Sequence, residues 1–293
     1  TGTVNKTETS PTELTKMMIG REVFLNIEKK TAKQGDTVLE VRDVWTSGEK
    51  EISKIRGISF DVKAGEIVGI AGIDGNGQSE LIEAIAGLRK VEKGNVILGG
   101  TDITNKSVKK IREAGLTHIP EDRNTRGLNR AFTIADNLAE VELDKTPIVK
   151  GGIVNKSAIS KRAEEMIKKF DIRPADGSLP TSSLSGGNAQ KVVVAREVNL
   201  GGKLLIASQP TRGVDIGAIE SIRSILQDVK EQGLGVLLVS AELEEVMSLS
   251  DRIIVMHEGK ITGRMNADEA DEETLGLLMM GGHNAEEKGE QHE

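Results

Sequence analysis

The sequence predicts an α/β fold in which the central strands run parallel and alternate with helices. The apolar runs Leu204 to Ala207 and Val236 to Ser240 have the length of strands and are flanked by helical stretches, as in parallel strands that are covered on both faces. Two of these stretches carry apolar residues at helical spacing, which predicts faces that pack into a core. They are Ile222, Ile225, Leu226 and Val229, and Ala163, Met166, Ile167 and Phe170.

Further strands are expected in the first third of the chain. Leu39 to Val44, Ile58 to Val62 and Val96 to Leu98 look like short strands around a glycine-punctuated region, and Ile67 to Ala71 looks like a short buried strand. In a chain of 293 residues, 37% hydrophobic residues are enough for a substantial core. We therefore expect one main domain, over residues 37–281.

The two ends of the chain resemble each other when the chain is shifted on itself by about 261 positions. Both ends also look like short helices, because residues 10–13 form a capping box with proline at the first helical position and Asp271 takes the corresponding cap. We interpret residues 1–36 as the tail of a preceding, similar domain and its linker; the alternative is a chance match between two polar helix starts. The coinciding pairs are Gly2 with Gly263, Asn5 with Asn266, Glu8 with Glu269, Leu14 with Leu275, Met18 with Met279 and Gly20 with Gly281. Residues 282–293 are charged and unpatterned, so we expect them to be disordered.

The composition argues against several classes of function. With 39 Lys and Arg against 46 Asp and Glu, the net charge is −7, which opposes non-specific attraction to nucleic acid phosphates. Aromatic residues make up only 2%, so side chains that could stack on bases are scarce. The absence of cysteine excludes disulfides and thiolate metal sites, and no apolar run approaches the roughly 20 residues of a membrane span. We expect no nucleic acid partner, and any membrane role must come through another protein.

A glycine-rich segment after the strand expected at residues 67–71 has the layout of a phosphate-binding loop. Its glycines let backbone N–H groups converge on an anion at a helix N-terminus, where the helix dipole also favours negative charge. The lysine expected in such a loop is Gln78 here, and the loss of a positive charge should weaken phosphate binding. Ser79 keeps a hydroxyl that could reach Mg²⁺. The candidate nucleotide-binding residues of this segment are Gly72, Asp74, Gly75, Asn76, Gly77, Gln78, Ser79 and Glu80.

Taken alone, this segment fits an ordinary glycine turn equally well. A dinucleotide-binding loop is disfavoured, because residues 75–80 lack the last glycine of that fingerprint.

A second anion cradle is expected at residues 184–191. A serine hydroxyl and two glycine N–H groups open a valine-rich helix there, without a lysine. The structural alternative is a plain Ser-Gly-Gly turn before a helix. The string resembles the signature motif of the ATP-binding cassette (ABC) family, and other motifs follow in that family's order. The candidate residues are Ser185, Gly186, Gly187, Asn188 and Gln190.

The resemblance implies roles for further positions. Residues 203–211 resemble the Walker B strand, but Ser208 and Gln209 replace the Asp that would orient Mg²⁺ and the Glu that would polarise the attacking water. Ala241 occupies the position of the switch histidine, and Glu121 that of the glutamine loop. Asp215 fits the loop that crosses to the partner domain.

The replacements share one consequence for the site on this chain's own loop. The catalytic positions Gln209 and Ala241 hold neither a base nor a group that could contact the γ-phosphate, and Mg²⁺ would have only the hydroxyls of Ser79 and Ser208. We therefore expect intrinsic hydrolysis to be weak or absent.

The resemblance covers residues 39–262 and implies a P-loop ABC ATPase fold. Such a fold has a RecA-like core sheet, an N-terminal antiparallel β-subdomain, and a helical subdomain, here at about residues 121–190. In this family two cassettes pair head to tail, so each signature motif closes over ATP held by the partner's loop.

The replaced catalytic positions beside an intact signature resemble the second cassette of tandem sugar and nucleoside importer ATPases. The strings at residues 74–78 and 208–213 are more similar to the nucleoside (basic membrane lipoprotein type) branch than to the ribose or galactose branch. This resemblance implies ATP and Mg²⁺ as cofactors. It also implies three partners, namely an N-terminal cassette of the same polypeptide, transmembrane permease subunits and, indirectly, a substrate-binding lipoprotein, and a peripheral position on the cytoplasmic face of the bacterial cell membrane.

Other functions remain open at this point. A sugar importer of the ribose or galactose type shares most of the motifs, and a module that binds nucleotide without hydrolysing it, for regulation, would look the same in sequence. A soluble cassette that acts on DNA or the ribosome is disfavoured by the net charge.

A few smaller features have ordinary alternatives. Arg123, Arg126 and Arg130 lie in a polar stretch that fits contact with a permease, or simply a solvated charge run. We interpret Trp45 as a packed surface residue, and His118 and His257 lack partners at metal-ligand spacing.

Overall fold

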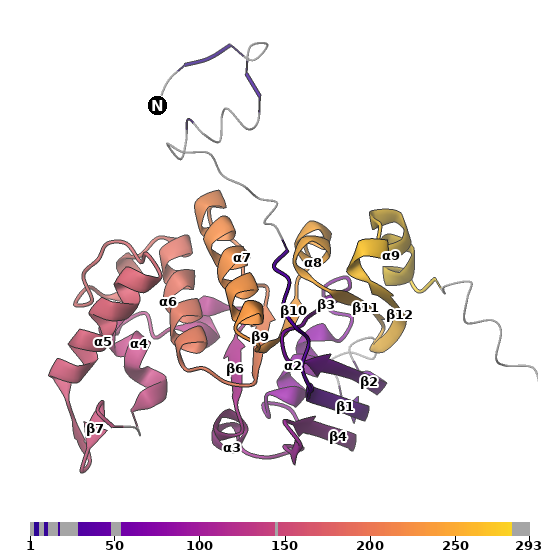
Figure 1. Ribbon diagram of the computed structural model, residues 1–293, viewed down its shortest axis with the longest axis horizontal. Coiled ribbons are helices and arrows are strands. Elements are labelled where there is room, and N and C mark those ends of the chain that lie inside the picture. The colour runs from indigo at the N-terminus through magenta and orange to yellow at the C-terminus, as the bar shows by residue number, and fades with distance from the viewer. Residues whose placement is uncertain are drawn as a thin grey trace, which may run out of the picture.

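The computed structural model describes residues 3–5, 9–10, 17, 29–47, 54–143 and 146–282. The expected α/β fold is confirmed. Figure 1 shows a central sheet between helices, with a smaller sheet towards one end of the molecule and a group of helices at the other. Apart from Met17 and Gly282, the helix expected after Ser10 and the tail expected at residues 282–293 lie outside the described residues.

The central sheet has six strands in the order β12-β11-β3-β10-β9-β6. All neighbouring pairs are parallel except β11 and β12, which are antiparallel. The strands are β3 (Ile67–Ala71), β6 (Leu116–Ile119), β9 (Leu204–Ser208), β10 (Gly235–Val239), β11 (Arg252–His257) and β12 (Lys260–Asn266). The sequence predicted β3, β9 and β10, which are the buried middle of this sheet.

The central sheet separates two cores because alternate strand residues point to opposite faces. Ile70, Ile206 and Leu237 belong to a core shared with the smaller sheet. Leu205 and Leu238 belong to a core on the other face, together with α7 and the helical group. The continuous apolar runs of these strands therefore follow from burial on both faces.

The smaller sheet is antiparallel, with strand order β2-β1-β4-β5. Its strands are β1 (Thr37–Thr46), β2 (Ile55–Lys63), β4 (Lys93–Leu98) and β5 (Thr101–Asp102). This confirms the expected antiparallel β-subdomain, although each of its three longer strands extends beyond the apolar run that predicted it.

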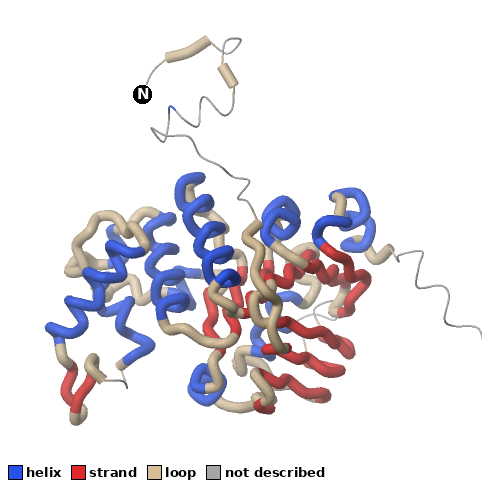
Figure 2. Tube along the Cα trace, viewed as in Figure 1, coloured by secondary structure: helices blue, strands red, loops and turns tan. Residues whose placement is uncertain are grey.

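The helices lie on both faces of the central sheet and at one end of it (Figure 2). They are α2 (Gln78–Ile85), α3 (Val108–Glu113), α4 (Ile134–Ala139), α5 (Lys156–Lys169), α6 (Gly186–Asn199), α7 (Ile216–Glu231), α8 (Leu243–Leu249) and α9 (Glu272–Met279). Shorter turns are η3 (Arg123–Gly127), η4 (Glu140–Glu142), η5 (Thr181–Ser183) and η6 (Ala267–Glu269), and β7 (Val149–Lys150) pairs with β8 (Ile153–Val154).

The helical group consists of α4 and α5, which pack against α6. The predicted stripe on α5 is buried, with Met166 3% and Phe170, at the end of the helix, 5% exposed. Ile134 and Leu138 of α4 join the same core, as do the valines of α6. The apolar face of α7 is buried as predicted, apart from Ile225, which is partly buried.

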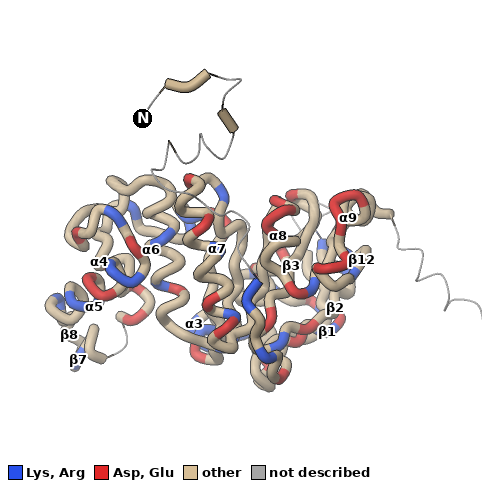
Figure 3. The backbone as a smooth tube through the Cα atoms, turned by 45° about the horizontal axis from the view of Figure 1, so that its top comes forward, with Lys and Arg blue, Asp and Glu red and all other residues tan. Residues whose placement is uncertain are grey.

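Charges of both signs are interspersed over the described part of the chain, without a basic stripe (Figure 3). Among the described residues, no helix is both long and apolar enough to span a membrane.

Candidate functional site

Part of the predicted site lies at the carboxyl edge of the central sheet, where ligands bind in open α/β sheets. A cavity of about 170 Å³ lies beyond the ends of β3, β6, β9 and β10. Eight of the predicted residues line it: Gly72, Asp74, Gly75, Gln78, Ser79, Glu121, Ser208 and Gln209.

The predicted phosphate-binding loop connects β3 to α2, whose first residue is Gln78. Gly75 and Gly77 have φ values of 89° and 105°, a left-handed conformation that costs glycine little. Gly77 caps α2 without a side-chain hydrogen bond. The first N–H groups of α2 and the helix dipole therefore favour an anion in front of the loop.

The amide of Gln78 lies back on its own loop. Its side chain is buried, and Nε2 donates to the carbonyl oxygen of Ile73 at 3.1 Å. The residue that replaces the lysine therefore brings no charge to the cavity.

Asn76, Gly77 and Glu80 are not among the residues that line the cavity. The side chain of Asn76 donates to the carbonyl of Ile73 at 3.0 Å and accepts from the N–H of Glu258 at 2.8 Å. Its own carbonyl accepts from Gly259 N–H. Asn76 therefore fastens the loop to the turn between β11 and β12.

Glu121 connects the loop to the far wall of the cavity. The hydroxyl of Ser79 donates to Oε2 of Glu121 at 3.0 Å, and Nη1 of Arg212 lies 2.7 Å from Oε1. Arg212 also lines the cavity. The sequence did not single out Arg212, because it lies in a loop without periodicity and matches no catalytic position.

Gln209 and Ala241, which we expect at replaced catalytic positions, contact each other. Gln209 follows β9 with a φ of 48°, and its N–H donates to the carbonyl of Val239 at 2.7 Å. Its side-chain Oε1 accepts from the N–H of Ala241 at 3.2 Å. Ala241 is not part of the cavity wall, whereas Ser208 is. Oγ of Ser208 is buried and has no hydrogen-bond partner in the structure.

Two further charged side chains of the cavity, Glu83 and Arg126, are paired with each other. Glu83 accepts from Arg126 at 2.6 Å and from Arg89 at 2.7 Å, and the bond to Glu83 raises the pKa of Arg126. Burial, with help from Arg112 and Arg126, lowers the pKa of His118 to about 4. The imidazole is therefore neutral at pH 7 and adds no positive charge.

The predicted signature residues lie outside this cavity, at the start of α6. Ser185 is the N-cap of α6, and its Oγ accepts from Nδ2 of Asn188 at 3.0 Å. Oδ1 of Asn188 accepts from the N–H of Arg173 at 2.8 Å. Gln190 is 2% exposed and donates to the carbonyl of Pro210 at 2.8 Å, so it ties α6 to the loop after β9.

Gly187 and Asp215 bring the starts of α6 and α7 together. A Cβ on Gly187 would lie 2.5 Å from Oδ2 of Asp215 and 2.7 Å from Cβ of Ala218. The carboxylate of Asp215 caps α7 by accepting from the N–H of Ala218 at 3.0 Å. Gly186 lies 3.0 Å, measured from its ideal Cβ position, from Nη2 of Arg123.

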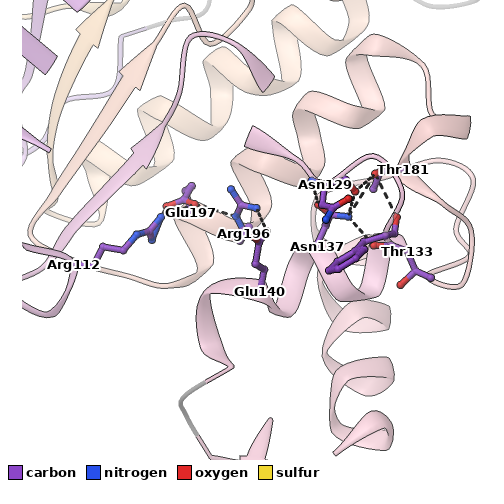
Figure 4. Close-up of polar contacts among 9 residues, drawn as sticks. Arg112, Asn129, Thr133, Asn137, Glu140, Thr181, Arg196 and Glu197 are labelled. Carbon is purple, nitrogen blue, oxygen red and sulfur yellow. Dashed lines mark hydrogen bonds and ion pairs between the residues drawn. The ribbon is translucent and has the colours of Figure 1, made fainter. Parts of the chain in front are cut away.

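A groove beside the cavity is lined by Arg126 and Arg130, and by Arg112, Glu140 and Arg196. The last three belong to a chain of ion pairs that also includes Glu197 (Figure 4). Glu197 of α6, fully buried, accepts from Arg112 of α3 at 2.8 Å and from Nε of Arg196 at 3.0 Å. Arg196 reaches Glu140 at 3.1 Å. These ion pairs therefore link α3, α6 and the helical group.

The smaller sequence features have local partners. Nε1 of Trp45 donates to Asp43 at 2.8 Å, and Lys93 lies over its ring. Nδ1 of His257 is 2.8 Å from the carbonyl oxygen of Met279. Within the described residues no group of three or more His, Cys, Asp or Glu side chains is placed to hold a metal.

The order of the motifs and the cavity at the sheet edge define a nucleotide-binding cassette of the P-loop type. A family model described as ABC transporter matches residues 55–212, and the chain belongs to that family. Its fold resembles the ATP-binding cassette MJ1267 of an ABC transporter, with a TM-score of 0.70 and 22% identity over 84% of this chain and 98% of that one. The P-loop ABC ATPase fold is thereby confirmed.

Curated relatives are more similar in sequence. The chain is 45% identical to the nucleoside import ATP-binding protein NupA of Lactococcus lactis subsp. cremoris, over 92% of this chain and 54% of that protein. It is also 45% identical to the guanosine import ATP-binding protein NupO of Bacillus subtilis, over 95% and 55%. The ribose import ATP-binding protein RbsA of Bacillus cereus is 37% identical, over 94% and 54%. The chain thus spans about half the length of these relatives.

Proposed function

We propose that this chain is a cassette of an ABC importer that binds Mg-ATP in its own cavity without turning it over, and that its signature motif completes the hydrolysis site of a partner cassette. The observation that carries this proposal is the contrast between the two anion cradles. At the cavity, Gln209 and Ala241 are hydrogen-bonded to each other. At the start of α6, outside that cavity, Ser185 and two glycines keep the signature pattern.

The cavity provides groups that can bind the phosphates and the metal ion of a nucleoside triphosphate. The glycine loop and the start of α2 favour phosphate. Ser79 and the buried, unpartnered Oγ of Ser208 supply hard oxygen atoms, which Mg²⁺ prefers, and the metal usually adds only one or two carboxylates to waters and phosphates. These residues therefore fit Mg²⁺, which would neutralise phosphate charge. Since Gln209 is an amide, no group at that position takes a proton from the attacking water.

The arrangement of the whole protein is part of the proposal. We infer that residues 1–36 are the tail of a preceding cassette and its linker, that residues 37–281 form this cassette, and that about 121–190 is its helical subdomain. The support is that the chain spans about half the length of its curated relatives.

We propose nucleosides as the class of solute. Relatives with nucleoside and guanosine import names are 45% identical, whereas those with ribose and glucose names are 36% to 39% identical. The partners are then transmembrane permease subunits and, indirectly, a substrate-binding lipoprotein, at the cytoplasmic face of the bacterial cell membrane. Arg126 and Arg130, which line the groove, are candidates for contact with the permease.

A second candidate is a regulatory module that binds nucleotide without any catalytic role. The neutral catalytic positions favour it as much as they favour a non-hydrolysing half. The signature cradle distinguishes the two, because a purely regulatory module has no use for it.

The test is ATP hydrolysis by the tandem protein that contains this cassette. Ser185→Ala removes a hydroxyl that would bond the partner's phosphate, and a hydrogen bond to a charged group is worth about 1.5 to 3 kcal/mol. Turnover should fall roughly tenfold or more. Ser183→Ala is the matched control, since that hydroxyl donates to the carbonyl of Pro180. Unchanged turnover in the Ser185 variant would refute the signature-donor role.

A further inference from the structure

The cavity has lost one cation and two acids at its motif positions, at residues 78, 208 and 209, yet a cation and an acid lie together on its wall. Gln78 stands where phosphate loops carry lysine, and Ser208 ends β9 without a carboxylate. Arg212 and Glu121 line the same cavity and are bonded to each other at 2.7 Å. Neither lies at a position of the lost charge.

Arg212 is the cation best placed to change partners. The lining also contains Arg126, but Arg126 is bonded to Glu83, which is 15% exposed and shared with Arg89. Removing Arg126 from Glu83 would leave a largely buried carboxylate with one partner fewer. The side chains of Arg212 and Glu121 are 57% and 39% exposed, and such exposed pairs contribute little to stability.

The backbone holds the position of Arg212 while its side chain can turn. Arg123 donates to the carbonyl of Arg212 at 2.7 Å and to that of Gly213 at 3.0 Å. Gln190 holds the carbonyl of Pro210 in the same loop. A triphosphate carries more charge than Glu121, and guanidinium binds phosphate with paired hydrogen bonds.

The second carboxylate oxygen of Glu121 contacts Ser79 at the start of α2. Oε2 accepts from the hydroxyl of Ser79 at 3.0 Å, the residue at which P-loop proteins bind Mg²⁺. The buried Oγ of Ser208, which has no partner in the structure, belongs to the same wall. These are the hard oxygen ligands that a divalent cation takes together with phosphates.

We propose that Arg212 supplies the positive charge that the phosphate loop lacks, and that Glu121 is its exchange partner. The terminal phosphate of the nucleotide takes Arg212 from Glu121, and the freed carboxylate faces the divalent cation beside Ser79. The inference rests on the proposed binding of Mg-ATP in this cavity. It makes metal and phosphate binding cooperative. Phosphate binding to Arg212 frees the carboxylate of Glu121 for the cation, and cation binding to Glu121 frees Arg212 for the phosphate.

The experiment measures equilibrium binding of ATP by isothermal titration calorimetry, with Mg²⁺ and with EDTA. Arg212→Gln should weaken binding by at least about tenfold in Mg²⁺ and reduce the preference for ATP over AMP, while Arg212→Lys, which keeps the charge but not the paired hydrogen bonds, should lose less affinity than Arg212→Gln. Glu121→Gln should tighten binding of metal-free ATP severalfold, because the competitor for Arg212 is gone. It should also reduce the gain in affinity on adding Mg²⁺ by about tenfold.

The controls separate this inference from the proposed function. Arg42→Gln removes an exposed arginine that is paired with Glu40 outside the cavity, and it should bind ATP like the unchanged chain. If the unchanged chain does not bind ATP, the proposed function fails and this inference with it. If the chain binds ATP but Arg212→Gln or Glu121→Gln behaves as the control does, the charge exchange is refuted and the proposed function stands.

Discussion

Gln78 and Gln209 are two amides that line the cavity, and the side chain of each is hydrogen-bonded to a nearby backbone group. Gln78 donates to the carbonyl of Ile73, and Gln209 accepts from the N–H of Ala241. An amide in such a position satisfies the loop's polar groups but carries no charge toward a phosphate. The geometry of the loop is therefore kept while its electrostatics are changed.

Gln78→Lys should restore the missing charge. The ammonium would reach the outer phosphates from the first residue of α2, and a charge-assisted contact of this kind adds about 1.5 kcal/mol or more, or roughly tenfold in affinity. Titration calorimetry with Mg-ATP measures the change, with Gln78→Met as a neutral control. Equal affinity in the lysine variant would mean that phosphate does not bind in front of this loop.

His118 should make stability depend on pH. Its pKa is lowered to about 4 in the folded chain, whereas an unfolded histidine has a pKa near 6.5. As the pH falls below about 6.5, the unfolded state takes up a proton that the folded state does not, so stability present above that pH is lost down to about pH 4.

The unchanged chain should therefore lose about 2 kcal/mol more than His118→Gln between pH 7.5 and pH 5. Urea unfolding of both proteins at the two pH values measures this difference. Parallel pH dependence in the two proteins would show that folding does not lower the pKa of this imidazole.

At the scale of elements, a chain of ion pairs around the buried Glu197 connects α6 to α3 and to the helical group. Glu197→Gln should lower the free energy of unfolding by about 2 to 3 kcal/mol, because Arg112 and the 6% exposed Arg196 lose their shared carboxylate. Glu140→Gln, at a carboxylate that is 48% exposed, should cost under about 1 kcal/mol. Chemical denaturation compares them, and equal losses would mean that the ion-pair chain is not buried as described.

The close approach of α6 to α7 depends on the missing side chain at residue 187. Gly187→Ala should destabilise the chain by about 1 to 3 kcal/mol, because its Cβ would overlap the carboxylate that caps α7. Gly276→Ala is the control, since nothing lies within 4 Å of that position in α9. Alanine should be neutral or stabilising by about 1 kcal/mol there. Thermal unfolding curves decide, and a stable Gly187→Ala variant would contradict the packing.

The sequence predicted those elements whose burial leaves a periodic pattern. The stripe ending at Phe170 and the face of α7 around Leu226 are buried as expected, and Asp271 caps α9. Strands β11 and β12 were not assigned, although β11 is buried, and the two-residue strands β5 and β7 are too short to leave a pattern. Their positions depend on pairing with distant segments.

The site was predictable only where chemistry follows a motif. The loop and the signature are motifs, so Gly75 and Ser185 could be proposed from the sequence. The attachment of Asn76 to Glu258 and the pairing of Arg212 with Glu121 join residues far apart in the sequence, and no spacing rule connects them. Three-dimensional structure was needed to distinguish a loop-fastening asparagine from a ligand-binding one.

At the scale of the whole molecule, the two anion cradles lie on different parts of one cassette. The phosphate loop is at the sheet edge, and Ser185 opens α6 outside that cavity. An interface that uses both must bring in a second cassette, as the proposed head-to-tail pairing does. The chain spans about half the length of its curated relatives.

The most direct test of the account measures binding and turnover of Mg-ATP on one preparation of this chain alone. The account predicts that the chain binds Mg-ATP and that the nucleotide is recovered intact after many times the interval in which an active cassette would hydrolyse it. Sustained phosphate release by the chain alone would contradict the account, because it would require a base that neither Gln209 nor Ala241 provides.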